Sequence, residues 1–67
     1  MNNKLKDRRL EVGFSTQKEF AEYINMSLYT YMSYEQGRRH PKLEHAQKIL
    51  RGLKESSMDI FYPDVIL

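Results

Sequence analysis

The 67-residue sequence contains no cysteine and no long apolar run. Without cysteine the chain can form neither a disulfide nor a thiolate metal site, so a reducing compartment suits it. No apolar stretch has the length of a signal peptide or a membrane span, so we expect a cytoplasmic protein without membrane contact. The length allows one small domain, whose core needs tight helix packing or self-association for stability.

The sequence also lacks the groups that catalysis requires. It has no cysteine nucleophile, no glycine-rich phosphate loop and no pairing of a base with a nucleophile. His40, Glu44 and His45 resemble a set of metal ligands, but their spacing matches no zinc site and Pro41 lies between them. We therefore expect no enzyme, no metal and no cofactor, and a single domain without a small-molecule effector.

The net charge of +2 is unevenly distributed along the chain. Residues 27–54 carry six basic and two acidic side chains, whereas residues 55–67 carry three acidic side chains and no basic one. A positive middle and an acidic end are typical of a protein with a nucleic-acid face and a separate surface turned elsewhere. Ordinary solvated charge is the alternative interpretation.

Residues 16–37 have the pattern of two helices joined by a short turn, TQKEFAEYINMSLYTYMSYEQG. Thr16 and Glu19 stand in the order of a capping box, and apolar residues follow at helical spacing. Asn25 suits the left-handed turn that ends a helix, and Ser27 suits the cap of the next helix. Two helices and a turn within about twenty residues predict a helix-turn-helix.

The run from Gln17 to Pro41 resembles the lambdoid-repressor family of helix-turn-helix proteins, which includes Cro, CI and Xre-like regulators. The resemblance covers residues 4–61 and rests on the joint spacing of Gln17, Ala21, Ser27, Tyr34, Glu35, Gln36, Gly37, Pro41, Leu43, Glu44 and Ile49. It implies a lambda-repressor-like DNA-binding domain over residues 1–61, with the helix-turn-helix at 16–37. Residues 62–67 remain as an apolar C-terminal tail.

The predicted fold class is all-α, a compact bundle of four to five short helices. The first helix is capped by Asn2 or Asn3, runs to about Val12 and ends at Gly13. The link to the second helix carries Phe14, which we expect to plug the core. The second and third helices span about residues 17–24 and 28–36.

The third and fourth helices each have a predicted buried face. In the third, Tyr31 and Tyr34 face the core, and Gly37 ends the helix. The fourth helix buries a stripe at helical spacing, consisting of Leu43, Ala46, Ile49, Leu50 and Leu53. Gly52 is expected to weaken the last turn of this helix. Residues 58–61 are long enough for one more helical turn.

The resemblance implies two sets of DNA contacts. Phosphates would be bound by Gln17, at the start of the second helix, and by the basic loop formed by Arg38, Arg39, His40 and Lys42. Base edges would be read by the outward residues Leu28, Tyr29, Met32 and Ser33. Between residues 28 and 35 there is no Arg, Lys, Asn or Gln, the residues that discriminate bases best. We therefore expect modest specificity or readout of DNA shape.

The resemblance also implies a structural pair. Family members pair an arginine of the first helix with a glutamate at the end of the third, and Arg9 and Glu35 occupy these positions. The pair would orient the third helix on the domain.

The predicted function is a small sequence-specific DNA-binding transcriptional regulator of phage or mobile-element type, which binds operator DNA as a homodimer. The alternative is an antirepressor-like modulator of the same fold, which contacts a partner repressor through the apolar face of its third helix. In either case we expect association through Phe61, Val65, Ile66 and Leu67, with Phe61 and Ile60 also closing the core. The sequence leaves the operator and the sign of regulation open.

Overall fold

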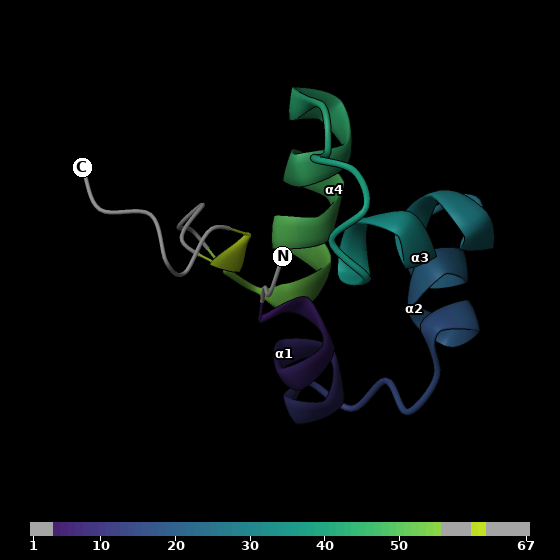
Figure 1. Ribbon diagram of the computed structural model, residues 1–67. Coiled ribbons are helices and arrows are strands. Elements are labelled where there is room, and N and C mark those ends of the chain that lie inside the picture. The colour runs from purple at the N-terminus through teal and green to yellow at the C-terminus, as the bar shows by residue number, and fades with distance from the viewer. Residues whose placement is uncertain (1–3, 56–59, 62–67) are drawn as a thin grey trace.

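The computed structural model describes residues 4–55 and 60–61, and these residues form four α-helices. The helices are α1 (Leu5–Glu11), α2 (Gln17–Tyr23), α3 (Leu28–Glu35) and α4 (Leu43–Leu53). Figure 1 shows α2 and α3 beside each other, α4 standing next to them and α1 below α4. No strand occurs within the described residues, and the predicted all-α fold is confirmed.

The helix starts differ in how their first backbone donors are satisfied. At α2 the Thr16 hydroxyl accepts from the backbone N–H of Glu19 at 3.1 Å, as the capping box predicts. The Glu19 carboxylate in turn accepts from the hydroxyls of Ser15 and Thr16. Ser27 occupies the predicted N-cap position of α3, but its side chain makes no capping hydrogen bond. The start of α2 is therefore the better fixed of the two.

The start of α1 differs from the prediction. Lys4 occupies its N-cap position and makes no capping hydrogen bond through its side chain. The Lys4 backbone N–H instead donates to the carbonyl of Ile60 at 3.0 Å, which ties the start of the chain to the segment after α4. Asn2 and Asn3, the expected caps, lie outside the described residues.

All four helices of the described residues end in the same backbone turn. The chain turns through a left-handed residue at each end, with φ of 106° at Gly13, 57° at Asn25, 76° at Gly37 and 58° at Lys54. After α3, for example, Gly37 N–H donates to Tyr34 O at 3.1 Å and Arg38 N–H donates to Ser33 O at 3.0 Å. These two bonds define the Schellman motif. Glycine and asparagine suit it, as predicted, whereas a lysine carries a steric cost there.

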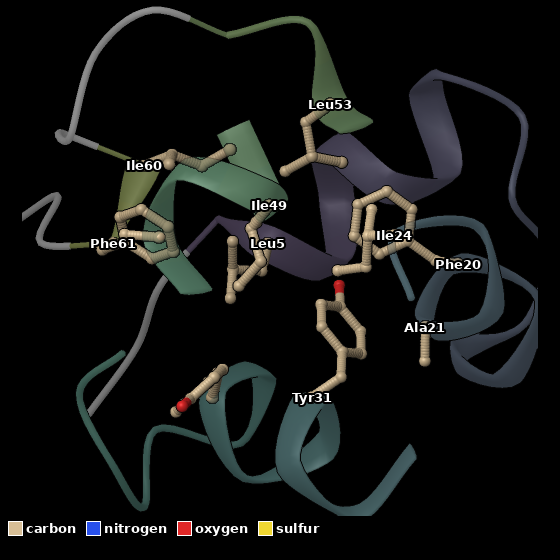
Figure 2. Close-up of a cluster of buried hydrophobic side chains, with 11 residues drawn as sticks. Leu5, Phe20, Ala21, Ile24, Tyr31, Ile49, Leu53, Ile60 and Phe61 are labelled. Atoms are coloured by element: carbon tan, nitrogen blue, oxygen red, sulfur yellow. The ribbon is translucent and has the colours of Figure 1, made fainter. Parts of the chain in front are cut away.

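The core lies between the four helices and residues 60–61 (Figure 2). Tyr31 points from α3 toward the ring of Phe20 on α2, and the two ring centroids are 5.1 Å apart. The predicted inward positions of Tyr31 and Tyr34 are confirmed, as is the closing of the core by Ile60 and Phe61. The buried apolar side chains are Leu5, Phe20, Ala21, Ile24, Tyr31, Tyr34, Ala46, Ile49, Leu53, Ile60 and Phe61.

Phe14, in the link between α1 and α2, packs against this core from the outside. Its ring lies 5.1 Å from that of Phe20 and 4.9 Å from that of Tyr23, centroid to centroid. The side chain is partly buried and packs against the core. The prediction that Phe14 packs into the core is therefore confirmed, with the ring at the edge of the core.

One prediction about α4 is wrong, and one residue of this helix has a role that the sequence did not indicate. Leu43 is 70% exposed, because α4 begins with it and this end of the helix stands beyond the core (Figure 1). Gly52 is buried, and a Cβ there would lie 2.6 Å from Ile24 Cγ2 and 2.9 Å from the Phe20 ring. The absence of a side chain lets α4 approach α2 closely. Gly52 therefore serves the packing of the helix pair, which its low helix propensity alone does not indicate.

Candidate nucleic-acid interface

The outward face of α3 carries the four residues expected to read bases. Tyr29 is 80% exposed, whereas Leu28, Met32 and Ser33 are partly buried. The Ser33 hydroxyl donates to the backbone carbonyl of Tyr29 at 2.9 Å. Because that bond uses the hydroxyl proton, Ser33 keeps only acceptor lone pairs for a ligand. Tyr29 is therefore the most accessible of the four side chains.

A basic loop, defined here as residues 38–42, follows α3 directly. Arg38, Arg39, His40 and Lys42 are all exposed, and Lys42 is the N-cap residue of α4. The Schellman bond from Arg38 N–H to Ser33 O fixes where the loop leaves the helix. The structure therefore places four of the predicted phosphate-binding residues between the end of α3 and the start of α4.

Gln17 lies at an open depression of about 530 Å³ where α1, the start of α2 and the end of α3 meet. This depression brings Gln17 together with Gln36, the C-cap residue of α3. It also includes Lys6, a cation that the sequence analysis did not select. Lys6 and Arg9 are three residues apart on one helix, and this shared face is the signal that could have found Lys6. The lining residues are Lys6, Arg9, Ser15, Thr16, Gln17, Glu35 and Gln36.

Arg9 and Glu35 join α1 to the last turn of α3. Arg9 Nε lies 3.2 Å from Glu35 Oε2 and Nη2 lies 3.3 Å from Oε1, in a forked arrangement. The remaining nitrogen, Nη1, donates to the Phe14 carbonyl at 2.7 Å. The two side chains are only 5% and 6% exposed. Because buried charges require partners, this geometry links α3 to both α1 and the link before α2.

The Tyr31 hydroxyl lies beside this ion pair. Burial, and then the neighbouring Glu35 carboxylate, raise the pKa of Tyr31 far above its ordinary value. The hydroxyl oxygen has no hydrogen bond of good geometry among the described residues. Tyr31 therefore remains neutral and acts mainly as a packing group beneath α3.

The sequence also predicts no metal site at the histidines and no membrane-spanning segment. Within residues 4–55 and 60–61, no group of three or more His, Cys, Asp or Glu is arranged to hold a metal ion. His45 instead shares a hydrogen bond of 2.6 Å with the Tyr34 hydroxyl. Among the described helices, none combines the length and the apolar character that crossing a membrane requires.

The predicted association residues fall into two groups. Phe61 is only 2% exposed, so its side chain has little surface left for a second chain. Val65, Ile66 and Leu67 lie outside the described residues. Exposed large apolar side chains occur elsewhere in the described part of the chain, at Leu10, Tyr23, Tyr29 and Leu43.

Comparison with known proteins adds one match. A family model described as Helix-turn-helix matches residues 5–61, a range that includes all four helices of the described structure. No curated protein and no solved structure is significantly similar to the chain.

Proposed function

The chain belongs to the helix-turn-helix family of Xre/Cro/CI-like DNA-binding regulators, and we propose that it is a repressor of phage type that binds operator DNA as a homodimer. The observation that carries this proposal is the placement of the basic loop, which begins where α3 ends. A turn fixed by Gly37 sets the exposed Arg38 and Arg39 beside the helix that carries Tyr29. Phosphate-binding cations next to an outward helix face are what duplex recognition needs.

The phosphate contacts come from the two places that flank α3. In the basic loop after α3, Arg38, Arg39, His40 and Lys42 lie along the DNA backbone. At the start of α2, the side-chain amide of Gln17 donates to a phosphate. Each neutralised phosphate releases counterions, so affinity falls as salt rises. Three or four contacts correspond to a slope of about −3 in log affinity against log salt for each subunit.

Specificity comes from the outward side chains of α3. Tyr29, Leu28 and Met32 offer apolar surface to thymine methyl groups, and Ser33 accepts from the amino group of adenine or cytosine. Because a bidentate Arg, Lys, Asn or Gln contact is missing from residues 28–34, discrimination between sequences is modest. The remaining discrimination between sequences comes from differences in DNA shape.

The experiment that tests DNA binding replaces both arginines of the loop. Arg38→Ala with Arg39→Ala weakens binding to all duplexes alike and makes the salt slope less negative by about 2. Arg51→Ala is the matched control, because Arg51 is an exposed arginine in the last turn of α4, at the opposite end from the loop. Fluorescence anisotropy on the DNA upstream of the gene measures the affinity and the salt slope of each variant. The proposal fails when no duplex binds more tightly than about 10⁻⁵ M at physiological salt, the level of non-specific attraction.

One observation favours a second function, an antirepressor-like modulator that contacts a partner repressor. Tyr29 is 80% exposed on a face without base-discriminating side chains, and exposed aromatic residues are common in protein interfaces. Repeating the anisotropy assay in the presence of a candidate partner regulator separates the two functions. The modulator releases that regulator from its operator, whereas the repressor binds DNA by itself.

The homodimer rests on the composition of residues 62–67, which include Val65, Ile66 and Leu67. Burying three such side chains contributes about 1.5–3 kcal/mol each before ordering costs. In a dimer on DNA the two copies of α3 lie about 34 Å apart, one helical turn. Deleting residues 64–67 gives a monomer by analytical ultracentrifugation. A truncated chain that keeps its oligomeric state contradicts the tail's part in association.

A further inference from the structure

A hydrogen bond between Tyr34 and His45 joins α3 to α4. Tyr34 Oη and His45 Nδ1 are 2.6 Å apart, and the two ring centroids are 5.7 Å apart. Tyr34 is 4% exposed on the inner side of α3, while His45 is partly buried on the first half of α4. This contact fixes the imidazole ring one helical turn beyond Lys42, the last cation of the basic loop.

The hydrogen bond is compatible with both charge states of the imidazole. With a neutral His45 the hydrogen bond can run in either direction. The Tyr34 hydroxyl donates to Nδ1 when the imidazole proton lies on Nε2, and its oxygen accepts from Nδ1–H in the other tautomer. When His45 is charged, Nδ1 carries a proton, and the Tyr34 oxygen can accept it after its hydroxyl rotates. Protonation therefore adds a positive charge at a fixed position without releasing the ring from α3.

The charges around His45 are mostly positive. Lys42 and Lys48 lie three residues before and after it on α4 and its N-cap, hence on the same helical face. Arg39 faces it from the basic loop, Glu44 is its acidic neighbour, and Tyr34 faces it from α3. Burial, then Lys42 and Lys48, hold the pKa of His45 below its ordinary value. In the free protein the imidazolium is thus disfavoured.

We propose that His45 is a proton-linked phosphate-binding residue, which takes up a proton when the basic loop meets the DNA backbone. This inference rests on the proposed DNA binding and adds a residue to that face. Phosphates offset the charges of Lys42 and Arg39, which removes part of the repulsion that disfavours the imidazolium. By linkage, a proton gained on binding makes affinity rise as pH falls through the titration range of histidine.

The test measures the affinity for a random-sequence duplex of about 20 base pairs, because phosphate contacts do not depend on sequence. Anisotropy is recorded at constant ionic strength between about pH 5.5 and pH 8, the range in which histidine changes charge. We expect the wild-type affinity to increase about three- to tenfold from the upper to the lower pH, since each unit of pKa shift corresponds to a factor of ten. His45→Gln, whose amide oxygen can still accept from Tyr34, loses most of this increase.

Gln47→Ala is the matched control, because Gln47 lies on the exposed side of α4 and outside the proposed phosphate contacts. We expect it to keep the pH dependence of the wild type. Because His40 belongs to the basic loop, both variants are also measured in a His40→Gln background. The inference is overturned when His45→Gln keeps the full pH dependence in either background. A chain that binds no duplex at any pH overturns the proposed DNA binding as well, which is a separate result.

A second measurement does not depend on the folding of a variant. The imidazole C–H resonances of the wild-type protein, followed by NMR against pH with and without the duplex, report the pKa of each histidine. We expect the pKa of His45 to rise on DNA binding. An unchanged value for His45 in the bound state overturns the inference even if the affinity depends on pH.

Discussion

The third and fourth helices are held on the same core in different ways. In α4 the apolar residues Ala46, Ile49 and Leu53 are buried, and charged residues occupy the opposite face. In α3 aromatic residues lie on both sides, with Tyr31 fully buried and Tyr29 80% exposed. An amphipathic pattern such as that of α4 is what packing alone requires. The exposed side of α3 is not explained by packing.

The two helices also differ in their polar connections. α3 is joined to α1 by the buried Arg9–Glu35 pair, whereas α4 lies so close to α2 that a glycine is needed at position 52. A buried ion pair is directional and sets the orientation of a helix, while apolar packing mainly sets its distance. The orientation of α3 therefore depends on a directional pair of charges, whereas the position of α4 against α2 depends mainly on close apolar packing.

Loss of the ion pair that joins α3 to α1 should lower the unfolding free energy more than any of the other substitutions. Arg9→Ala or Glu35→Ala leaves one buried charge without its main partner, which costs about 3 kcal/mol of unfolding free energy. Urea denaturation followed by circular dichroism measures the loss. Glu11→Ala is the control, since its exposed pair with Arg8 contributes about 0.2–0.5 kcal/mol.

The double variant sharpens this prediction. Replacing Arg9 and Glu35 together by alanine removes both charges, so the loss is smaller than the sum of the two single losses. Equal stability of both single variants and the wild type would show that the pair does not hold α3.

The next effect tests the close packing of α4. Helix propensity predicts that Gly52→Ala stabilises the protein by about 1 kcal/mol. The contacts predict the opposite sign, a loss of about 1–3 kcal/mol, because the new methyl group would overlap with Ile24 and Phe20. Thermal and urea unfolding decide between them, with Gln47→Ala on the exposed side of α4 as control. A gain in stability for Gly52→Ala would contradict the packing account.

A smaller change in stability is expected from substitutions at the residues that follow the two helices. The left-handed residue that follows α3 is Gly37, and the one that follows α4 is Lys54. Lys54→Gly removes the steric cost of that conformation at the expense of some backbone entropy, so we expect a gain of about 0.5–1 kcal/mol. Gln47→Gly, in the regular part of α4, has the opposite sign, a loss of about 1 kcal/mol. A loss of stability for Lys54→Gly would show that its side chain has a further role.

The sequence predicted those parts of the fold that depend on local chemistry. The capping box at Thr16 and the helix ends at Asn25 and Gly37 follow from residue type and spacing within a few positions. Tyr31 and Tyr34 could be assigned to the core because one face of a short helix must be buried. Lys54 could not be predicted as a left-handed residue, because lysine has no preference for that conformation.

Contacts between distant parts of the chain could not be predicted. Propensity marks Gly52 as a weak point in a helix, whereas its neighbours Ile24 and Phe20 come from α2, about thirty positions earlier in the sequence. Leu43 fits the apolar stripe by spacing, but the end of α4 extends past the core and leaves it exposed. The Tyr34–His45 contact needs the actual crossing of α3 and α4. For the candidate site, the sequence selected Gln17, the basic loop and the α3 face. It did not show that Lys6 lies at the same depression as Gln17, or that His45 contacts Tyr34.

We propose that the exposed face of α3 reads DNA and is not required for folding. Tyr29→Ala tests both parts of this proposal, because Tyr29 is the most exposed residue of that face. We expect the unfolding free energy to change by less than about 0.5 kcal/mol, as is usual for surface substitutions. The relative affinities for a panel of duplexes, measured by competition anisotropy, should change in rank while the salt slope remains. An unchanged ranking of the duplexes, together with weaker binding to a candidate partner regulator, would contradict DNA readout and support contact with a partner protein.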